Sequence, residues 1–215
     1  KLNKKNTINI GAVYTLGRTL HGDAYKYHQT GAESNGSIYV QSQTGDTIPN
    51  PFKMPHTFGI GLTYVYDNRL TIGVDYTLQK WNTADLAWSK FNKESVEMNS
   101  RTKIAFGAEF VPSYISHNYL KRIRYRMGAY CSSPYNKVSY TSPDTGTTSF
   151  QDGAREYGVS IGFGLPMFQS KSMLNISGQY IKVSPKFKGL MEENYLRINI
   201  GLTFNERWFM KWKVD

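Results

Sequence analysis

The clearest feature of the chain is an alternation of apolar with small or polar residues between positions 57 and 79. The segment reads TFGIGLTYVYDNRLTIGVDYTLQ, with Asp67-Asn68 at its centre. Successive side chains of a β-strand point to opposite faces of its sheet, so this period of two predicts two strands joined by a tight turn. Each strand has about ten residues, apolar on one face and small or polar on the other, which is typical of transmembrane β-strands.

Six further segments alternate in the same way and are predicted to be strands. They lie at residues 7–17, 101–111, 120–132, 157–165, 174–180 and 196–204. Because the side-chain period fixes which residues share a face, one apolar set is predicted to contact lipid. This set comprises Phe58, Ile60, Leu62, Leu70, Ile72, Val74, Ile104, Phe106, Ile198, Ile200 and Leu202.

The connections between the predicted strands alternate between short and long. Short links occur at Asp67-Asn68, 112–119 and 166–170, and the links after Gly17, Lys80, Ser133 and Val183 are longer. Outer-membrane barrels have short periplasmic turns and longer outer loops. We therefore expect an all-β fold, a transmembrane antiparallel up-and-down β-barrel with about eight spanning strands, as a single domain over residues 1–215.

This topology also predicts how the chain lies in the bacterial outer membrane. Both ends of the chain are expected on the periplasmic side. Segments 18–54, 82–100 and 134–153 are expected outside the cell. Within the first of them, residues 37–41 are predicted to form an additional strand beyond the membrane.

The charge of the chain is strongly positive, with a formal net charge of +10 and a pI near 9.5. Lys and Arg are spread over strands and loops without a nucleic-acid-binding motif, so we expect no nucleic-acid partner. Outer-membrane lipid and anionic lipopolysaccharide, an acidic ligand or an acidic protein surface are the expected counterparts. A run of about eighteen apolar residues is absent, which excludes a helical membrane protein.

Residue types that often carry catalysis or bind metals are sparse. His21, His28, His56 and His117 share no metal-ligand spacing, and the single Cys131 excludes an internal disulfide and a zinc–cysteine cluster. The G-x-S-x-G motif of serine hydrolases is missing. We therefore expect no enzyme, no metal site and no cofactor.

Arg122, Arg124 and Arg126 are the most unusual polar feature of the predicted strands. Their spacing of two places them on one face, and an arginine facing lipid near mid-bilayer costs roughly 2–4 kcal/mol, so they are predicted to face the lumen. They either form a ligand-binding ladder for an anion such as a fatty-acid carboxylate or pair with lumen carboxylates. The second, structural interpretation is favoured, with Glu109 pairing with Arg122 across the link at 112–119.

Glycine recurs on the predicted inner face of the barrel. Side chains are missing there at Gly59, Gly61, Gly73, Gly107, Gly158, Gly162 and Gly164. A bare wall allows close approach of another backbone, so these positions favour a wide barrel with an inserted segment over a narrow, filled one.

Three stretches of the sequence resemble one family of outer-membrane proteins. They are PHTFGIGLTYVYDNRLTIGVDYTLQKW, TKIAFGAEFVP and NYLRINIGLTFNERWFMKWKVD. Together they resemble the C-terminal half of FadL/OMPP1/TodX-type proteins in the form found in Bacteroidetes. The resemblance implies a barrel of about 14 strands closed by an N-terminal hatch. This chain has no hatch and fewer strands, so it would supply the C-terminal portion.

The function implied by this resemblance is transport of hydrophobic or amphipathic small molecules, such as long-chain fatty acids, with the ligand held in the lumen. The alternative is a FadL-like structural subunit of a larger outer-membrane biogenesis or secretion complex, because a fold does not fix function. The aromatic residues Trp208, Phe209 and Trp212 either form a belt at the headgroup level or dock such subunits.

Overall fold

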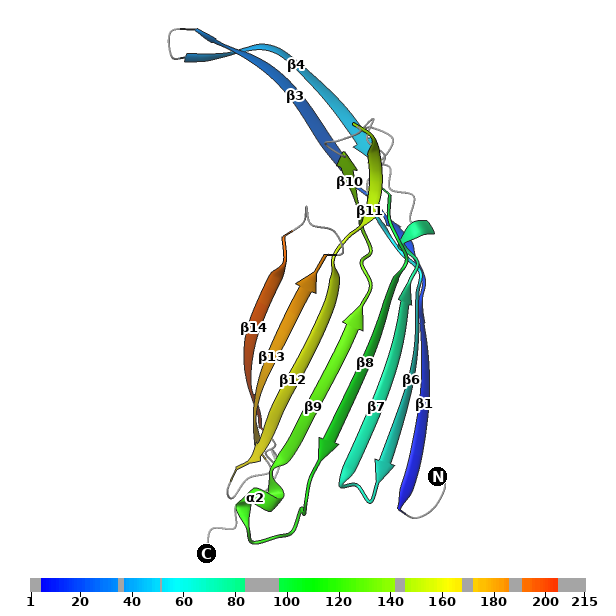
Figure 1. Ribbon diagram of the computed structural model, residues 1–215, viewed down its shortest axis with the longest axis vertical. Coiled ribbons are helices and arrows are strands. Elements are labelled where there is room, and N and C mark those ends of the chain that lie inside the picture. Colours follow the sequence, from blue (N-terminus) through cyan, green and yellow to red (C-terminus); the bar gives the residue numbers. More distant parts are fainter. Residues whose placement is uncertain are drawn as a thin grey trace, which may run out of the picture.

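The computed structural model describes residues 5–34, 37–50, 52–83, 97–141, 146–167, 172–185 and 191–204. Its main element is an eight-stranded antiparallel sheet that curves along its width (Figure 1). In sheet order the strands are β1 (Asn6–Thr15), β6 (Thr57–Tyr66), β7 (Leu70–Gln79), β8 (Arg101–Phe110), β9 (Arg124–Ser132), β12 (Arg155–Pro166), β13 (Met173–Ser184) and β14 (Glu193–Thr203).

The all-β class and the large antiparallel sheet confirm the prediction from alternation. The predicted closure is not found, because β1 pairs only with β6 and β14 only with β13 within the described ranges. The sheet is therefore open, with β1 and β14 as its edges. Among these same residues, no helix is long and apolar enough to cross a membrane.

The segment between β1 and β6 continues their pairing into a long hairpin. β2 (Arg18–Leu20) pairs with β5 (Phe52–Met54), and β3 (Asp23–Ser34) pairs with β4 (Ser37–Pro49). The partners Thr15 and Thr57, Arg18 and Met54, and Asp23 and Pro49 follow one register, because their residue numbers add to the same total. Closer to the tip the register shifts by one residue, between Thr30 and Gly31. The hairpin extends well beyond the end of the main sheet (Figure 1).

The predicted strand at residues 37–41 is thus confirmed as part of β4, and its partner β3 was not predicted. A second small ladder, β10 (Lys137–Thr141) with β11 (Thr148–Asp152), lies at the same end of the sheet (Figure 1). Of the predicted loop 82–100, residues 84–96 lie outside the described residues. The same holds for Trp208, Phe209 and Trp212, and the side of the membrane that each segment faces stays a prediction.

One face of the sheet is apolar across its whole width. A single cross-strand row runs through Ile10, Leu62, Val74, Phe106, Ala129, Val159, Tyr180 and Leu196. The residues predicted to contact lipid share this face by register, and most are exposed, Ile200 to 72%. The buried hydrophobic side chains of the described chain are Ile48, Val111, Ile123 and Ile181. An apolar face this large is found where lipid or another protein covers it.

The opposite face is polar, and glycine lines its centre. Gly73, Gly107 and Gly128 stand side by side on β7, β8 and β9. A Cβ added to Gly107 would meet nothing within 4 Å, so packing among the described residues does not require glycine there. Packing does require glycine at position 158, because the Tyr130 ring lies across the position that a Cβ would occupy. The predicted glycine-rich inner face is confirmed as one face of the sheet.

The predicted strand at 120–132 is wrong at its beginning. Residues Tyr119–Arg122 form a short helix, α2, and β9 begins only at Arg124. The helix is capped by Asn118, whose side-chain oxygen accepts a hydrogen bond from the Leu120 amide at 3.0 Å. Such a cap satisfies a backbone N–H that would otherwise lack a partner in the first turn. Arg122 therefore belongs to α2 and not to the strand.

The tight turn between β6 and β7 is confirmed at Asp67 and Asn68. Both residues have positive φ, 49° and 53°, and the Arg69 amide donates to the Tyr66 carbonyl at 2.9 Å. Positive φ at both central positions is the requirement of a type I′ turn, whose twist matches that of a hairpin.

Replacing Asn68 with alanine is expected to lower the free energy of unfolding by about 1 kcal/mol, because left-handed backbone is unfavourable for alanine. Asn68→Gly should leave stability unchanged or raise it, since glycine adopts this conformation freely. Thermal unfolding of both variants in one detergent checks the expectation. Equal melting temperatures for the two variants would show that the turn conformation does not limit stability.

Candidate functional site: two charged clusters on the polar face

The first cluster joins β8, β9 and β13 near the short-turn end of the sheet. Glu109 stands directly opposite Arg126 in the β8–β9 pairing. Its carboxylate accepts a hydrogen bond from Arg126 Nε at 2.6 Å and another from an Arg124 terminal nitrogen at 3.3 Å. Arg126 also donates to the Asn175 side-chain oxygen at 2.8 Å. We name Glu109, Arg124, Arg126 and Asn175 the lower cluster.

The predicted pairing of Glu109 with Arg122 is wrong. The link between β8 and β9 contains α2, and the register sets Phe110 opposite Tyr125, so Glu109 meets Arg126 and Arg124 instead. The Arg122 guanidinium lies 5.6 Å from the centroid of the Tyr119 ring within α2. Of the three arginines, the structure brings Arg124 and Arg126 together on one carboxylate.

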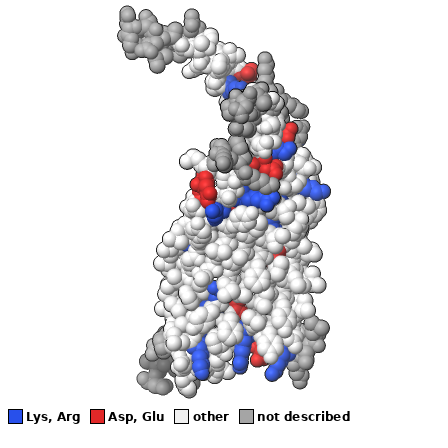
Figure 2. Space-filling model, in the orientation of Figure 1, with Lys and Arg blue, Asp and Glu red and all other residues white. Residues whose placement is uncertain are grey.

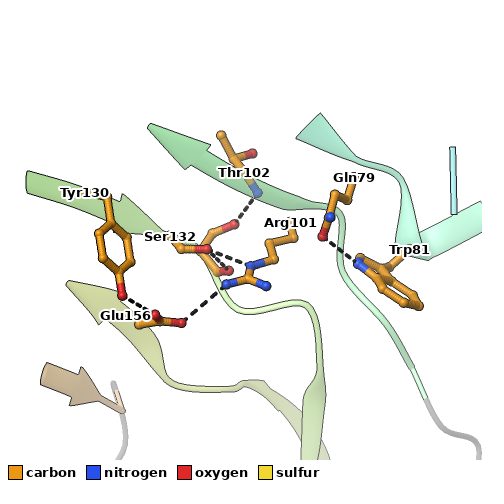
Figure 3. A network of polar contacts seen from close by, with 8 residues as sticks. Gln79, Trp81, Arg101, Thr102, Tyr130, Ser132 and Glu156 are labelled. Carbon is orange, nitrogen blue, oxygen red and sulfur yellow. Dashed lines mark hydrogen bonds and ion pairs between the residues drawn. The ribbon is translucent and has the colours of Figure 1, made fainter. Parts of the chain in front are cut away.

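The second cluster joins β8, β9 and β12 near the opposite end of the sheet (Figure 3). Arg101 donates from Nε to the Ser132 hydroxyl at 2.7 Å and from a terminal nitrogen to Glu156 at 3.3 Å. The Tyr130 hydroxyl donates to the other oxygen of Glu156, and Lys103 Nζ lies 4.5 Å from the centroid of the Tyr130 ring. We name Arg101, Lys103, Tyr130, Ser132 and Glu156 the upper cluster.

Sequence reasoning missed the upper cluster, although a signal was present. Arg101 and Lys103 have the same spacing of two as Arg124 and Arg126, on the neighbouring strand. Their carboxylate partner Glu156 lies on β12, more than fifty residues further along the chain, and only the sheet order brings it close. Charge alternation within a strand indicates a polar face, but not which distant strand completes it.

Both clusters act as lateral clamps between strands. Glu109 on β8 accepts hydrogen bonds from two arginines of the adjacent β9. Glu156 on β12 accepts one from Tyr130 on the adjacent β9 and one from Arg101 on β8, the strand beyond it, so each carboxylate is compensated within the sheet. Charge-assisted hydrogen bonds of this kind are stronger than neutral ones. This arrangement supports the structural interpretation of Arg124 and Arg126. A ligand-binding role for Arg122, Arg124 and Arg126 stays a prediction.

The charged residues of the sheet surface are concentrated toward its two ends. Figure 2 shows most Lys, Arg, Asp and Glu near the bottom and the top of the sheet, with a broad uncharged surface between them. An uncharged band with charged borders is the distribution expected for strands that cross a bilayer.

The histidines show no metal site in the part of the chain that the structure describes. His56 contacts the Tyr14 hydroxyl through Nδ1 at 2.7 Å, and the Gly17 amide donates to the same nitrogen at 3.2 Å. His56 thus joins the end of β1 to the start of β6, which is a structural contact.

Comparison with known proteins identifies the family of the chain. A family model described as BamG matches residues 1–215, the whole of the chain. The chain belongs to the BamG family. No curated protein and no solved structure matches it.

Membership of the BamG family corrects the sequence interpretation in two respects. The resemblance to FadL/OMPP1/TodX-type proteins was wrong as an assignment, and transport of fatty acids is not the function that the family supports. The alternative, a subunit of an outer-membrane biogenesis complex, agrees with the match. A BamG family protein is associated with the outer membrane and with other subunits of a complex there.

Proposed function

We propose that this BamG family chain is a membrane-embedded structural subunit of the BAM complex, which assembles outer-membrane proteins. The observation that carries the proposal is the family match over all of residues 1–215. In this role the chain is not an enzyme and needs no cofactor. Its partners are other subunits of the complex and the surrounding outer-membrane lipid and lipopolysaccharide.

The two faces of the sheet support embedding in the bilayer. The eight strands are 9 to 12 residues long, close to the roughly ten that a tilted strand needs to cross the hydrocarbon core. Their apolar face is exposed across the whole sheet, whereas the clustered charges lie on the other face. A sheet in lipid leaves no open edge, so the proposal requires that β1 and β14 are paired in the assembled protein.

Purification of the chain from native membranes tests this function. A tagged chain extracted in mild detergent is expected to bring down the other BAM subunits in fixed ratio. Its depletion is expected to lower the amount of folded outer-membrane barrel proteins while fatty-acid uptake per cell stays unchanged. Recovery of the chain alone, together with normal barrel assembly after depletion, would contradict the proposal.

A further inference from the structure

We propose that the tyrosine-bearing face of the β3–β4 hairpin is the docking surface for another protein subunit of the complex. This inference rests on the proposed function and names the part of the chain that makes the contact. The surface consists of Tyr25, Tyr27 and Gln29 on β3 and Gln43, Gly45 and Thr47 on β4. We name it the tyrosine face.

The hairpin extends beyond the main sheet without a core of its own (Figure 1). It continues the β1–β6 ladder past the end of the sheet (Figure 1). Side chains from position 42 to position 47 on β4 are all exposed, whichever face they occupy. Among the hairpin side chains whose burial the structure describes, those at 23–31 and 42–49, only Ile48 at the base is fully buried. A two-stranded ladder on its own is marginally stable in water, because neither face is covered. A bound partner would supply the missing cover.

The chemistry of the tyrosine face is that of a protein contact. Tyr25 and Tyr27 are 64% and 63% exposed, although most tyrosine rings are at least half covered in folded domains. The Tyr27 ring lies over Gly45, where a Cβ would be 3.1 Å from the ring, so glycine leaves room for the ring at this position. Exposed, preorganised tyrosines supply large contact areas at low entropic cost and are frequent hot spots of interfaces.

The Gln29 side-chain nitrogen donates to the Gln43 side-chain oxygen at 3.1 Å, which extends the same surface with an ordered polar pair. The six residues of the tyrosine face carry no formal charge, and on the reverse face Lys26 stands opposite Asp46. The hairpin therefore offers no concentrated positive charge to the phosphates of lipopolysaccharide, in contrast to the chain as a whole at +10.

The backbone points to a polypeptide as the occupant. Within the described residues, β3 and β4 pair only with each other, so each strand has an outer edge of unpaired N–H and C=O groups. Such an edge is completed by an extended segment of another protein, with the adjacent side chains giving specificity. The partner predicted by this chemistry is an uncharged, partly apolar protein surface with hydrogen-bond acceptors for the two tyrosine hydroxyls.

The test compares the two faces of the hairpin in the native complex. The double variant Tyr25→Ala, Tyr27→Ala is expected to lower recovery of at least one co-purifying subunit about tenfold or more, because a few aromatic residues carry most of the affinity of an interface. The matched control, His28→Ala with Thr44→Ala, changes the reverse face at the same height and should leave recovery unchanged. Melting of each purified variant checks that the main sheet is intact.

A further variant and a cross-link distinguish loss of the docking contact from local unfolding of the hairpin. Tyr25→Lys leaves the Tyr27–Gly45 contact in place and should also reduce recovery. A photo-cross-linking amino acid at position 27 should form a covalent product with a subunit that co-purifies with the wild-type chain. Unchanged recovery of every subunit in the tyrosine variants, or cross-links to lipopolysaccharide alone, would overturn this docking surface. If the wild-type chain brings down no subunit at all, the proposed function itself fails.

Discussion

Replacing Glu109 with alanine is expected to lower the melting temperature of the detergent-solubilised protein by about 4–8 °C. The change leaves Arg124 and Arg126 on the polar face without the carboxylate that both contact, at 3.3 and 2.6 Å. Removing one partner of a fully buried ion pair costs about 3–5 kcal/mol. Removing one partner of a fully exposed pair costs less than about 1 kcal/mol. The three side chains are 26–38% exposed, so about 2 kcal/mol is expected. For a chain of this length, each kcal/mol corresponds to about 2–4 °C.

Two control variants show whether the effect comes from the clamp. Glu192→Ala removes the partner of Lys182, but both side chains are about half exposed (49% and 46%), so its melting temperature should hardly change. Glu109→Gln keeps an acceptor oxygen for one arginine and should lie between alanine and wild type. If Glu109→Ala melts at the same temperature as Glu192→Ala, the lower cluster does not hold β8 and β9 together.

Replacing Phe106 with arginine is expected to reduce the stability of the protein in lipid vesicles by about 2–4 kcal/mol. Phe106 stands in the central apolar row, 44% exposed, between Val74 and Ala129. A guanidinium there must either enter hydrocarbon or pull the strand toward the interface. Urea titration in vesicles measures the effect, and Phe106→Ala separates the loss of the ring from the added charge.

The neighbouring residue Ala105 provides a matched control for the same charge. It lies on the polar face, directly opposite Asp75 on β7. Ala105→Arg should therefore be tolerated, since the new cation can pair with a carboxylate across the strands. If Ala105→Arg destabilises the protein as much as Phe106→Arg does, the two faces do not differ in environment. The proposal of a lipid-facing apolar surface would then be wrong.

The sheet could be predicted from the sequence because its side chains obey a strict period of two. Wherever that period continued through irregular structure, the prediction failed. Polar or small and apolar residues alternate from Arg122 to Ala129, yet Arg122 belongs to α2, the helix that Asn118 caps. The partner of Glu109 was consequently placed four residues away from Arg126. A register error of an even number of residues leaves each side chain on the same face but changes the residue opposite it. The polar face was therefore predicted correctly, while the ion pair was not.

Two further features could not be predicted because their determinants are not local. Of the β3–β4 ladder only residues 37–41 were predicted, because the rest of the ladder is rich in polar residues and shows no continuous apolar alternation. The family assignment failed for a related reason. Strands with alternating apolar residues and aromatic residues at their ends are typical of a membrane environment. Different families of outer-membrane proteins share that environment, so the pattern does not identify the family.

The common register of β1–β6, β2–β5 and the base of β3–β4 has a consequence for folding. Asn6 and Tyr66 are sixty residues apart, and a contact of that range normally requires closure of a long loop at a substantial entropic cost. Here the ladder can instead start at its tip, where Ser34 pairs with Ser37, and zip inward. Once the register shift between Thr30 and Gly31 is passed, the pairs Asp23–Pro49, Arg18–Met54 and Thr15–Thr57 share one register, so each ladder forms close to one that is already paired. Nucleation at the hairpin tip would therefore allow β1 to pair with β6 without closure of a long loop, although the two strands are far apart in sequence.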